Sequence, residues 1–161
     1  MKSFSEYIKE AYNFRLGGKE NKGVQHYNYF PKDKRELMEL IKKLCMKRTV
    51  YGDFNDIDTS EITNMSNLFT LSNAYGFDGD ISLWDTSNVT TMFCMFKHQS
   101  RFNIDISGWD VSEVTNMSFM FDHASNFDQD ISRWDTSSVA YNEYMFDECP
   151  IREEFKPKFK I

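Results

Sequence analysis

The sequence predicts an α/β solenoid, in which strand–turn–short-helix units stack behind a helical N-terminal cap. The first observation is a repeat, because Trp84, Trp109 and Trp134 follow one another at intervals of 25 residues. Residues 84–108 and 109–133 are identical at 14 of 25 positions. The second observation is that two side-chain periods alternate within each unit. A fixed period of this length is typical of units that stack and share one core.

The repeat consists of three full units and one partial unit. The full units cover residues 57–83, 84–108 and 109–133, and the partial unit covers 134–146. The first unit begins with IDTSEITNMSNLF, which matches WDTSNVTTMFCMF of the second unit, and it is two residues longer. The chain therefore divides into an N-terminal helix and linker, residues 1–30, and a capped repeat region, residues 31–161.

Each unit is expected to contain a short strand followed by a short helix. In FNIDISGWDVSEVTNMSFMF, Ile106 and Trp109 bracket a stretch rich in strand-forming residues and bounded by turn residues. Asp and Ser then satisfy backbone N–H groups at the turn and at the helix start. The apolar residues that follow fall on one side of a helix or 3₁₀ turn; they are Val114, Met117, Met120 and Phe121.

Stacking explains why the units are so alike, because one unit cannot bury its apolar face alone. Equivalent residues of successive units then lie on one another and form ladders. A constant residue in such a repeat is accordingly interpreted as structural. The expected ladder residues are Trp84, Trp109, Trp134, Asp80, Asp105, Asp130, Met92, Met117, Phe96 and Phe121.

The repeat resembles that of a known family. The phrases WDTSNVTTMFCMF and FNIDIS closely resemble the 25-residue repeat of BspA-like leucine-rich-repeat proteins, also described from mycoplasma lipoproteins. The resemblance covers Phe54 to about Asp147. It implies a leucine-rich-repeat-like stack, and it implies surface or adhesion roles for some members. The start, MKSFSEYI, also looks like the short helical starts of many tailed-phage proteins.

Both ends of the stack are expected to carry caps. Asp33 and Glu36 form a helix-start signal, followed by apolar residues at helical spacing, so a cap helix is predicted over residues 33–47. Residues 147–161 contain two prolines and two phenylalanines and are predicted to form the C-terminal cap. At the N-terminus, Phe4, Tyr7 and Ile8 mark the apolar stripe of a short helix. That helix either folds back on the stack or docks on a partner.

Composition and charge exclude several classes of protein. The chain has 161 residues, 40% hydrophobic, which is too apolar for a disordered protein. Neither a membrane span nor a signal peptide is found, so a cytoplasmic or virion-associated location is expected. Residues 53–149 carry 17 acidic and 3 basic side chains, which disfavours nucleic-acid binding. Three scattered cysteines indicate neither a disulfide framework nor a zinc site.

No motif of catalysis or cofactor binding occurs in the sequence. The chain is therefore expected not to be an enzyme and to hold no cofactor or metal. Calcium binding between stacked Asp-x-Asp pairs is the alternative interpretation of the aspartate series. His98 and His123 are 25 residues apart, as a ladder position requires, so their spacing does not predict a metal site.

The expected function is a non-catalytic protein–protein interaction or structural module with a protein partner. The phage-like start places a phage accessory or virion protein among the expected roles. Positions that differ between units are free to carry specificity. The candidate partner-binding residues are Leu83, Ile104, Arg133 and Phe93 in the repeats and Phe4, Tyr7 and Ile8 in the N-terminal helix. Two alternatives remain open: an acidic mimic of nucleic acid that inhibits a DNA-binding protein, and an exported surface adhesin.

Overall fold

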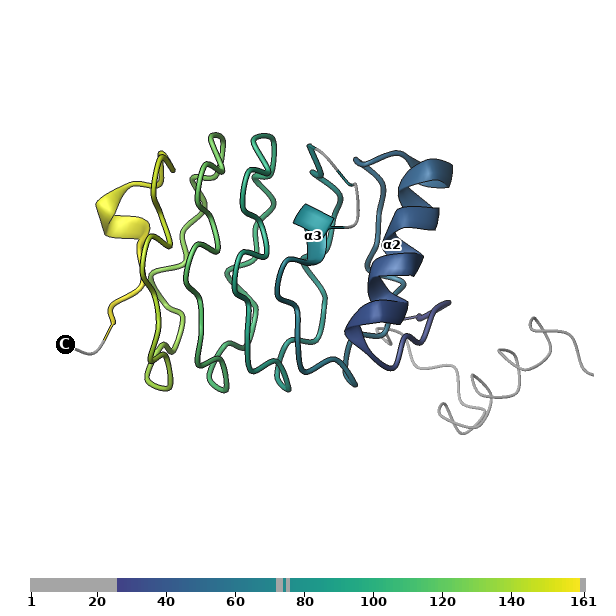
Figure 1. Ribbon diagram of the computed structural model, residues 1–161, viewed down its shortest axis with the longest axis horizontal. Coiled ribbons are helices and arrows are strands. Elements are labelled where there is room, and N and C mark those ends of the chain that lie inside the picture. The colour runs from purple at the N-terminus through teal and green to yellow at the C-terminus, as the bar shows by residue number, and fades with distance from the viewer. Residues whose placement is uncertain (1–25, 72–73, 75, 160–161) are drawn as a thin grey trace, which may run out of the picture.

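The computed structural model describes residues 26–71, 74 and 76–159. It contains one long helix, α2 (Lys34–Arg48), and two single-turn elements, α3 (Leu68–Leu71) and the 3₁₀ helix η1 (Glu153–Phe155). The remaining chain winds back and forth, and its successive windings, which we call coils, lie side by side. Helix α2 lies against one end of this row (Figure 1). The C-terminal segment lies against the other end. The segment carrying Phe4, Tyr7 and Ile8 lies outside the described residues.

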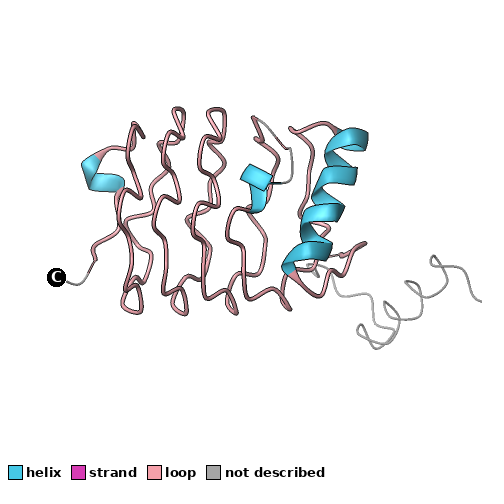
Figure 2. Cartoon of the chain, viewed as in Figure 1, coloured by secondary structure: helices cyan, strands magenta, loops and turns pink. Residues whose placement is uncertain are grey.

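The predicted α/β class is wrong. In the described part of the chain the units contain no strand and no sheet, only isolated parallel bridges between single residues (Figure 2). The helix expected in each unit is present only as α3 in the first unit. In the later units, residues such as Cys94 and Phe119 adopt φ values of 54° and 59°. This left-handed conformation interrupts a right-handed helix, so these segments form turns instead.

Backbone hydrogen bonds follow an alternating pattern in the segments 92–99 and 117–124. Every second N–H donates to the next coil, as in Cys94 N to Ser118 O at 3.1 Å and Phe119 N to Glu143 O at 2.9 Å. The N–H groups between them donate three residues back within their own coil, as from Met120 to the carbonyl of Met117 at 3.1 Å. Each coil is thus a row of overlapping turns. Its alternate N–H groups donate to carbonyls of the following coil and so join the two coils.

Aromatic rings form the centre of the core. Phe69, Phe96, Phe121 and Phe146 stack in sequence, with ring centroids 5.2, 5.5 and 5.8 Å apart. The first three are buried, and Phe146 is half-buried at the end of the row. In the coils of Phe69, Phe96 and Phe121 a second phenylalanine packs on this ladder, as Phe102 does on Phe96 at 3.9 Å. Offset ring stacking adds to the free energy gained by burying these side chains.

The tryptophans repeat one hydrogen bond along the stack. The indole N–H of Trp84 donates to the carbonyl of Phe54, that of Trp109 to Ile81, and that of Trp134 to Ile106. All three indoles are buried, at no more than 5% exposure. A buried indole N–H needs an acceptor, so each tryptophan fixes its position against the preceding coil.

Aspartates and threonines fix the turns at the edges of the coils. The carboxylates of Asp80, Asp110 and Asp130 each accept from the N–H and hydroxyl of the serine two residues later. Thr90 and Thr115 donate their hydroxyls to the carbonyl of the equivalent threonine in the preceding coil. These bonds satisfy turn N–H groups and explain the D-x-S and V-T phrases structurally.

The two ends are covered differently. Asp33 caps α2 by accepting from the N–H of Glu36, and α2 buries Leu37, Ile41 and Leu44 against the first coil. The sequence predicts this helix over residues 33–47, and the structure has it over Lys34–Arg48. At the other end, the carbonyl of Phe155 accepts from the N–H of Ile131 at 3.0 Å. In the described part of the chain, no helix has the length and apolar character needed to cross a bilayer.

One glycine compensates for an unusual residue in the first coil. Phe54 occupies the position taken by Ile81 and Ile106 in later coils, and a Cβ added at Gly79 would lie 2.5 Å from its ring. We expect Gly79→Ala to lower the free energy of unfolding by about 1–3 kcal/mol through overpacking. Adding Phe54→Ile should recover part of that loss, which urea denaturation of the double-mutant cycle measures.

Gly108→Ala is the matched control for this cycle. No atom lies within 4 Å of a Cβ added at Gly108, so its stability should match that of the unchanged protein. Strictly additive effects of the two substitutions would contradict the proposed contact between Phe54 and position 79.

Candidate interaction surface

Equivalent turns of neighbouring coils lie side by side and present one continuous outer surface, which we call the turn face. It consists of the exposed and half-buried side chains of residues 64–70, 91–98, 116–123 and 141–148. Equivalent residues of these segments meet in the parallel bridges Asn64–Thr91, Thr91–Asn116 and Asn116–Tyr141. Because the backbone is held by hydrogen bonds at every second residue, side chains on this face are presented by a fixed scaffold.

An aromatic stripe crosses the turn face. The rings of Phe93 and Phe119 meet edge to face at 6.0 Å, and those of Phe119 and Tyr144 stack at 5.1 Å. Phe93 and Phe119 are half-buried, whereas Tyr144 is 64% exposed. Phe119 and Tyr144 are both left-handed, which directs them outward while their neighbours Met120 and Met145 are buried. The stripe is therefore an outer ladder, separate from the buried phenylalanine ladder.

A charged cluster lies beside the stripe. The ammonium group of Lys97 is 4.7 Å from the centre of the Phe119 ring and 2.5 Å from a carboxylate oxygen of Asp122. The other carboxylate oxygen of Asp122 contacts Nδ1 of His123. The imidazole rings of His98 and His123 meet edge to face at 4.9 Å. The cluster combines a cation–π contact with a largely buried carboxylate, whose side chain is 6% exposed.

The environment of Asp122 keeps its carboxylate ionised. Burial alone would raise the pKa of Asp122, but hydrogen bonds from Lys97 and His123 outweigh this effect and hold the pKa below its ordinary value. The bond to Asp122 likewise raises the pKa of Lys97. Both partners are thus charged at neutral pH, and the pair holds the Lys97 side chain over the stripe.

The cysteines are not chemically activated. Burial raises the pKa of Cys45 to about 11 and raises the pKa values of Cys94 and Cys149 above the ordinary value. The thiolate is the reactive form, so these three thiols are poor nucleophiles at neutral pH. Among the residues that the structure describes, no three His, Cys, Asp or Glu side chains are arranged to hold a metal ion.

The candidate contact residues from the sequence lie on different parts of the coils. Phe93 belongs to the turn face. Leu83 is 59% exposed and Arg133 is exposed, at equivalent positions of the D-I-S-x-W turn. Ile104 is half-buried and packs against the hydrophobic core, which reduces the surface that it offers to a partner.

Sequence reasoning missed Phe119, Tyr144 and the cation Lys97 as one surface. The signal was weak, because Phe119 and Tyr144 align with Cys94 in the repeat and read as ordinary apolar positions. The first coil carries Asn67 at this position, with φ of 54°. Asparagine is the residue that commonly adopts this conformation, so Asn67 was the one indication of an outward-directed turn.

The D-x-S turns make a testable contribution to acid stability. Hydrogen bonds from the hydroxyl and N–H of Ser112 lower the pKa of Asp110, and equivalent serines lower those of Asp105 and Asp130. A lowered folded-state pKa means that the unfolded chain binds protons more readily. This stabilisation is therefore complete above about pH 5 and is lost as the pH falls below about 4.

We expect urea denaturation to show a lower free energy of unfolding at pH 3 than at pH 6. The triple variant Asp105→Asn, Asp110→Asn, Asp130→Asn isolates this effect, because the amide oxygen still accepts the N–H bond but cannot ionise. Its stability should vary less with pH than that of the unchanged protein. An identical pH dependence would show that these turns do not contribute.

Comparison with protein families matches residues 38–158 to a family described as mycoplasma protein of unknown function, DUF285. The chain belongs to the DUF285 family. The DUF285 match extends from α2 to the C-terminal segment and so includes every repeat. It confirms the mycoplasma-family part of the resemblance seen in the sequence and gives no support to its leucine-rich-repeat and phage parts. Comparisons with curated proteins and with solved structures found no match.

Proposed function

We propose that this protein is a non-catalytic protein–protein interaction module that binds its partner through the turn face. The observation that carries the proposal is the aromatic stripe of Phe93, Phe119 and Tyr144. It spans three coils and is displayed on a hydrogen-bonded backbone. Aromatic side chains on a rigid support are the residues that most often dominate the binding energy of a protein interface.

The chemistry beside the stripe favours a protein partner. Lys97 and Asp122 add one positive and one negative group within reach of the rings, and Glu143 accepts from the hydroxyl of Ser118 at 2.7 Å. An apolar centre with a polar rim is the usual composition of a protein interface. Preorganised side chains also lose less conformational entropy on binding.

The acidic body supports a second candidate, mimicry of nucleic acid. Residues 53–149 carry 17 acidic and 3 basic side chains. The repeat itself accounts for many of these acids, because Asp80, Asp110 and Asp130 accept hydrogen bonds from their turns. Binding to a DNA-binding protein through exposed carboxylates should collapse as salt rises, whereas binding through the aromatic stripe should persist.

The chain's own repeats supply conservative substitutions for the test. Phe93→Ser copies Ser66 and Ser118, and Phe119→Asn and Tyr144→Asn copy the left-handed Asn67. We expect this triple variant to fold and to lose its partners in affinity purification at both low and high salt. The control Leu83→Gly, which copies Gly108, should keep them. An unchanged partner list in the triple variant would overturn the proposal, and binding lost steeply with salt would favour mimicry.

A further inference from the structure

The last coil ends in a row of backbone N–H groups that have no acceptor in the described part of the chain. In the two preceding coils, alternate N–H groups donate across to the next coil, from Met92, Cys94, Phe96 and His98 and from Met117, Phe119, Phe121 and His123. Among the described residues, no further coil follows the equivalent residues of the last coil. Within the described residues, no acceptor bonds the N–H groups of Asn142, Tyr144, Phe146 and Glu148.

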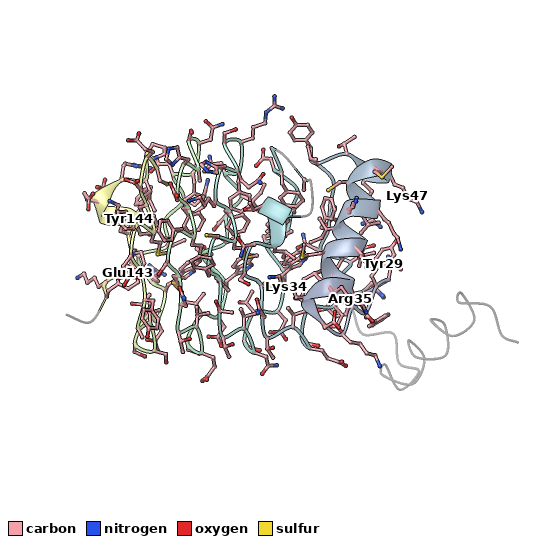
Figure 3. All side chains as sticks on the ribbon, in the orientation of Figure 1. Tyr29, Lys34, Arg35, Lys47, Glu143 and Tyr144 are labelled. Atoms are coloured by element: carbon pink, nitrogen blue, oxygen red, sulfur yellow. The ribbon has the colours of Figure 1, made fainter. Side chains whose placement is uncertain are left out.

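The C-terminal segment covers only the other half of this coil. Its carbonyls at Phe155 and Lys158 accept from the N–H of Ile131 and the hydroxyl of Thr136. Figure 3 shows Glu143 and Tyr144 at the end of the stack opposite α2. The open donors therefore lie beside a covered region, at the end of the row opposite α2.

A hollow lies between the open donors and the C-terminal segment. Its volume is about 540 Å³, and its walls include Tyr144 and Phe146 of the last coil and Glu154, Pro157 and Phe159 of the segment. Phe146 ends the buried ring ladder and stacks on Phe121 at 5.8 Å. A side chain entering this hollow would extend the aromatic ladder, while its backbone would meet the open N–H groups.

The direction of the hydrogen bonds restricts what can occupy this edge. Two copies meeting edge to edge would bring donors against donors, so a symmetric dimer through this surface gains no backbone bonds. A head-to-tail stack requires the opposite end of a second copy, where α2 buries Leu37, Ile41 and Leu44 against the first coil. The suitable occupant is therefore an extended segment of another protein, which offers a carbonyl oxygen at every second residue.

The charge of the edge indicates a basic occupant. Glu143, Asp147, Glu148 and Glu154 are exposed along it. Of the nearby cations, Lys156 is paired with Glu153 at 2.5 Å and Arg152 with Asp128 at 3.1 Å, and Lys158 lines the hollow. This one lysine does not balance the four exposed acids. The surplus is negative, and it would attract lysine or arginine side chains that alternate with residues facing the hollow.

We propose that the open edge of the last coil binds a basic, extended peptide segment of a partner protein by backbone addition. This inference goes beyond the proposed function, because the edge and the aromatic stripe share only Tyr144. The variant Phe93→Ser, Phe119→Asn alters the stripe and leaves the edge in place. The two proposals can therefore fail separately.

The probe is an acetylated, amidated heptapeptide of alternating lysine and tyrosine, added to the ¹⁵N-labelled full-length chain. We expect it to shift the amide resonances of Asn142, Tyr144, Phe146 and Glu148 and to slow their hydrogen exchange. The variant Glu143→Ser, Glu148→His, which copies Ser118 and His123, should bind about tenfold more weakly. Glu113→Lys, a charge reversal elsewhere on the repeats, should leave this binding unchanged.

Three results would overturn the proposal. The first is equal binding of a glutamate–tyrosine peptide with the same backbone. The second is a set of shifts confined to α2 or to the aromatic stripe. The third is strong protection of the four amides in the free protein, which would mean that the chain itself already occupies the edge.

Discussion

Replacement of Phe96 by alanine is expected to lower the free energy of unfolding by about 3–5 kcal/mol, the range found for buried aromatic residues. The Phe96 side chain is fully buried and stacks on Phe69, Phe102 and Phe121 at 5.2, 3.9 and 5.5 Å. Its removal would leave a cavity between three coils and interrupt the ladder at its centre. Urea denaturation followed by tryptophan fluorescence measures the loss.

Phe93→Ala provides the matched control, three residues away in the same coil. The Phe93 ring is half-buried on the turn face and touches one neighbouring ring, so its loss should cost about 1 kcal/mol or less. Equal effects of the two substitutions would mean that the buried ladder does not stabilise the stack more than the outer stripe does.

Deletion of residues 109–133 is expected to leave a folded protein that is one coil shorter. The deletion joins Gly108 to Trp134, so Trp134 takes the place of Trp109 and its indole can donate to Ile81. Phe146 can likewise stack on Phe96 in place of Phe121. We expect a loss of about 1–4 kcal/mol in the free energy of unfolding, in proportion to the 25 residues removed.

Deletion of residues 109–121 is the control for register. It removes about half a coil, so the remaining half presents the wrong residues to both neighbours and the ring ladder cannot continue. We expect this variant to lose cooperative thermal unfolding by circular dichroism. Two deletions with the same effect would contradict a stack in which each coil pairs with the next in register.

The repeat predicts the order of the coils, whereas the backbone conformation within each coil could not be predicted from the sequence. The 25-residue spacing of Trp84, Trp109 and Trp134 reflects a contact between neighbouring coils, which identical residues must satisfy in each unit. The spacing of Val114, Met117 and Phe121 predicts a short helix or 3₁₀ turn. Overlapping three-residue turns place side chains on one side just as a helix does, so the period could not distinguish them.

The left-handed turn residues explain most of the difference. Cys94, Phe119 and Tyr144 adopt a conformation that is uncommon for side chains of their type. Hydrogen bonds to the next coil hold Cys94 and Phe119 there, a long-range effect that local propensity does not contain. The same turns direct the aromatic stripe outward, so neither these turns nor the surface that they form could be predicted from the sequence.

The candidate contact residues were likewise only partly predictable from the sequence. Phe93 was selected because it differs from its counterpart Ser118, and it lies on the turn face beside Phe119. Ile104 is a candidate for the same reason, but it is half-buried. Its counterpart Gly79 is small because the Phe54 ring occupies the adjacent space, so this difference between units reflects packing in the core. Differences between units thus arise both from surface positions and from compensation inside the core.

Native-state amide hydrogen exchange tests most directly whether each coil is held by the next. We predict strong protection of the Phe119 and Phe121 amides, which donate to the following coil at 2.9 Å. The equivalent Tyr144 and Phe146 amides in the last coil should exchange at rates near those of an unstructured peptide. Equal protection at all four positions would show that the bonds between coils do not determine the stability of the stack.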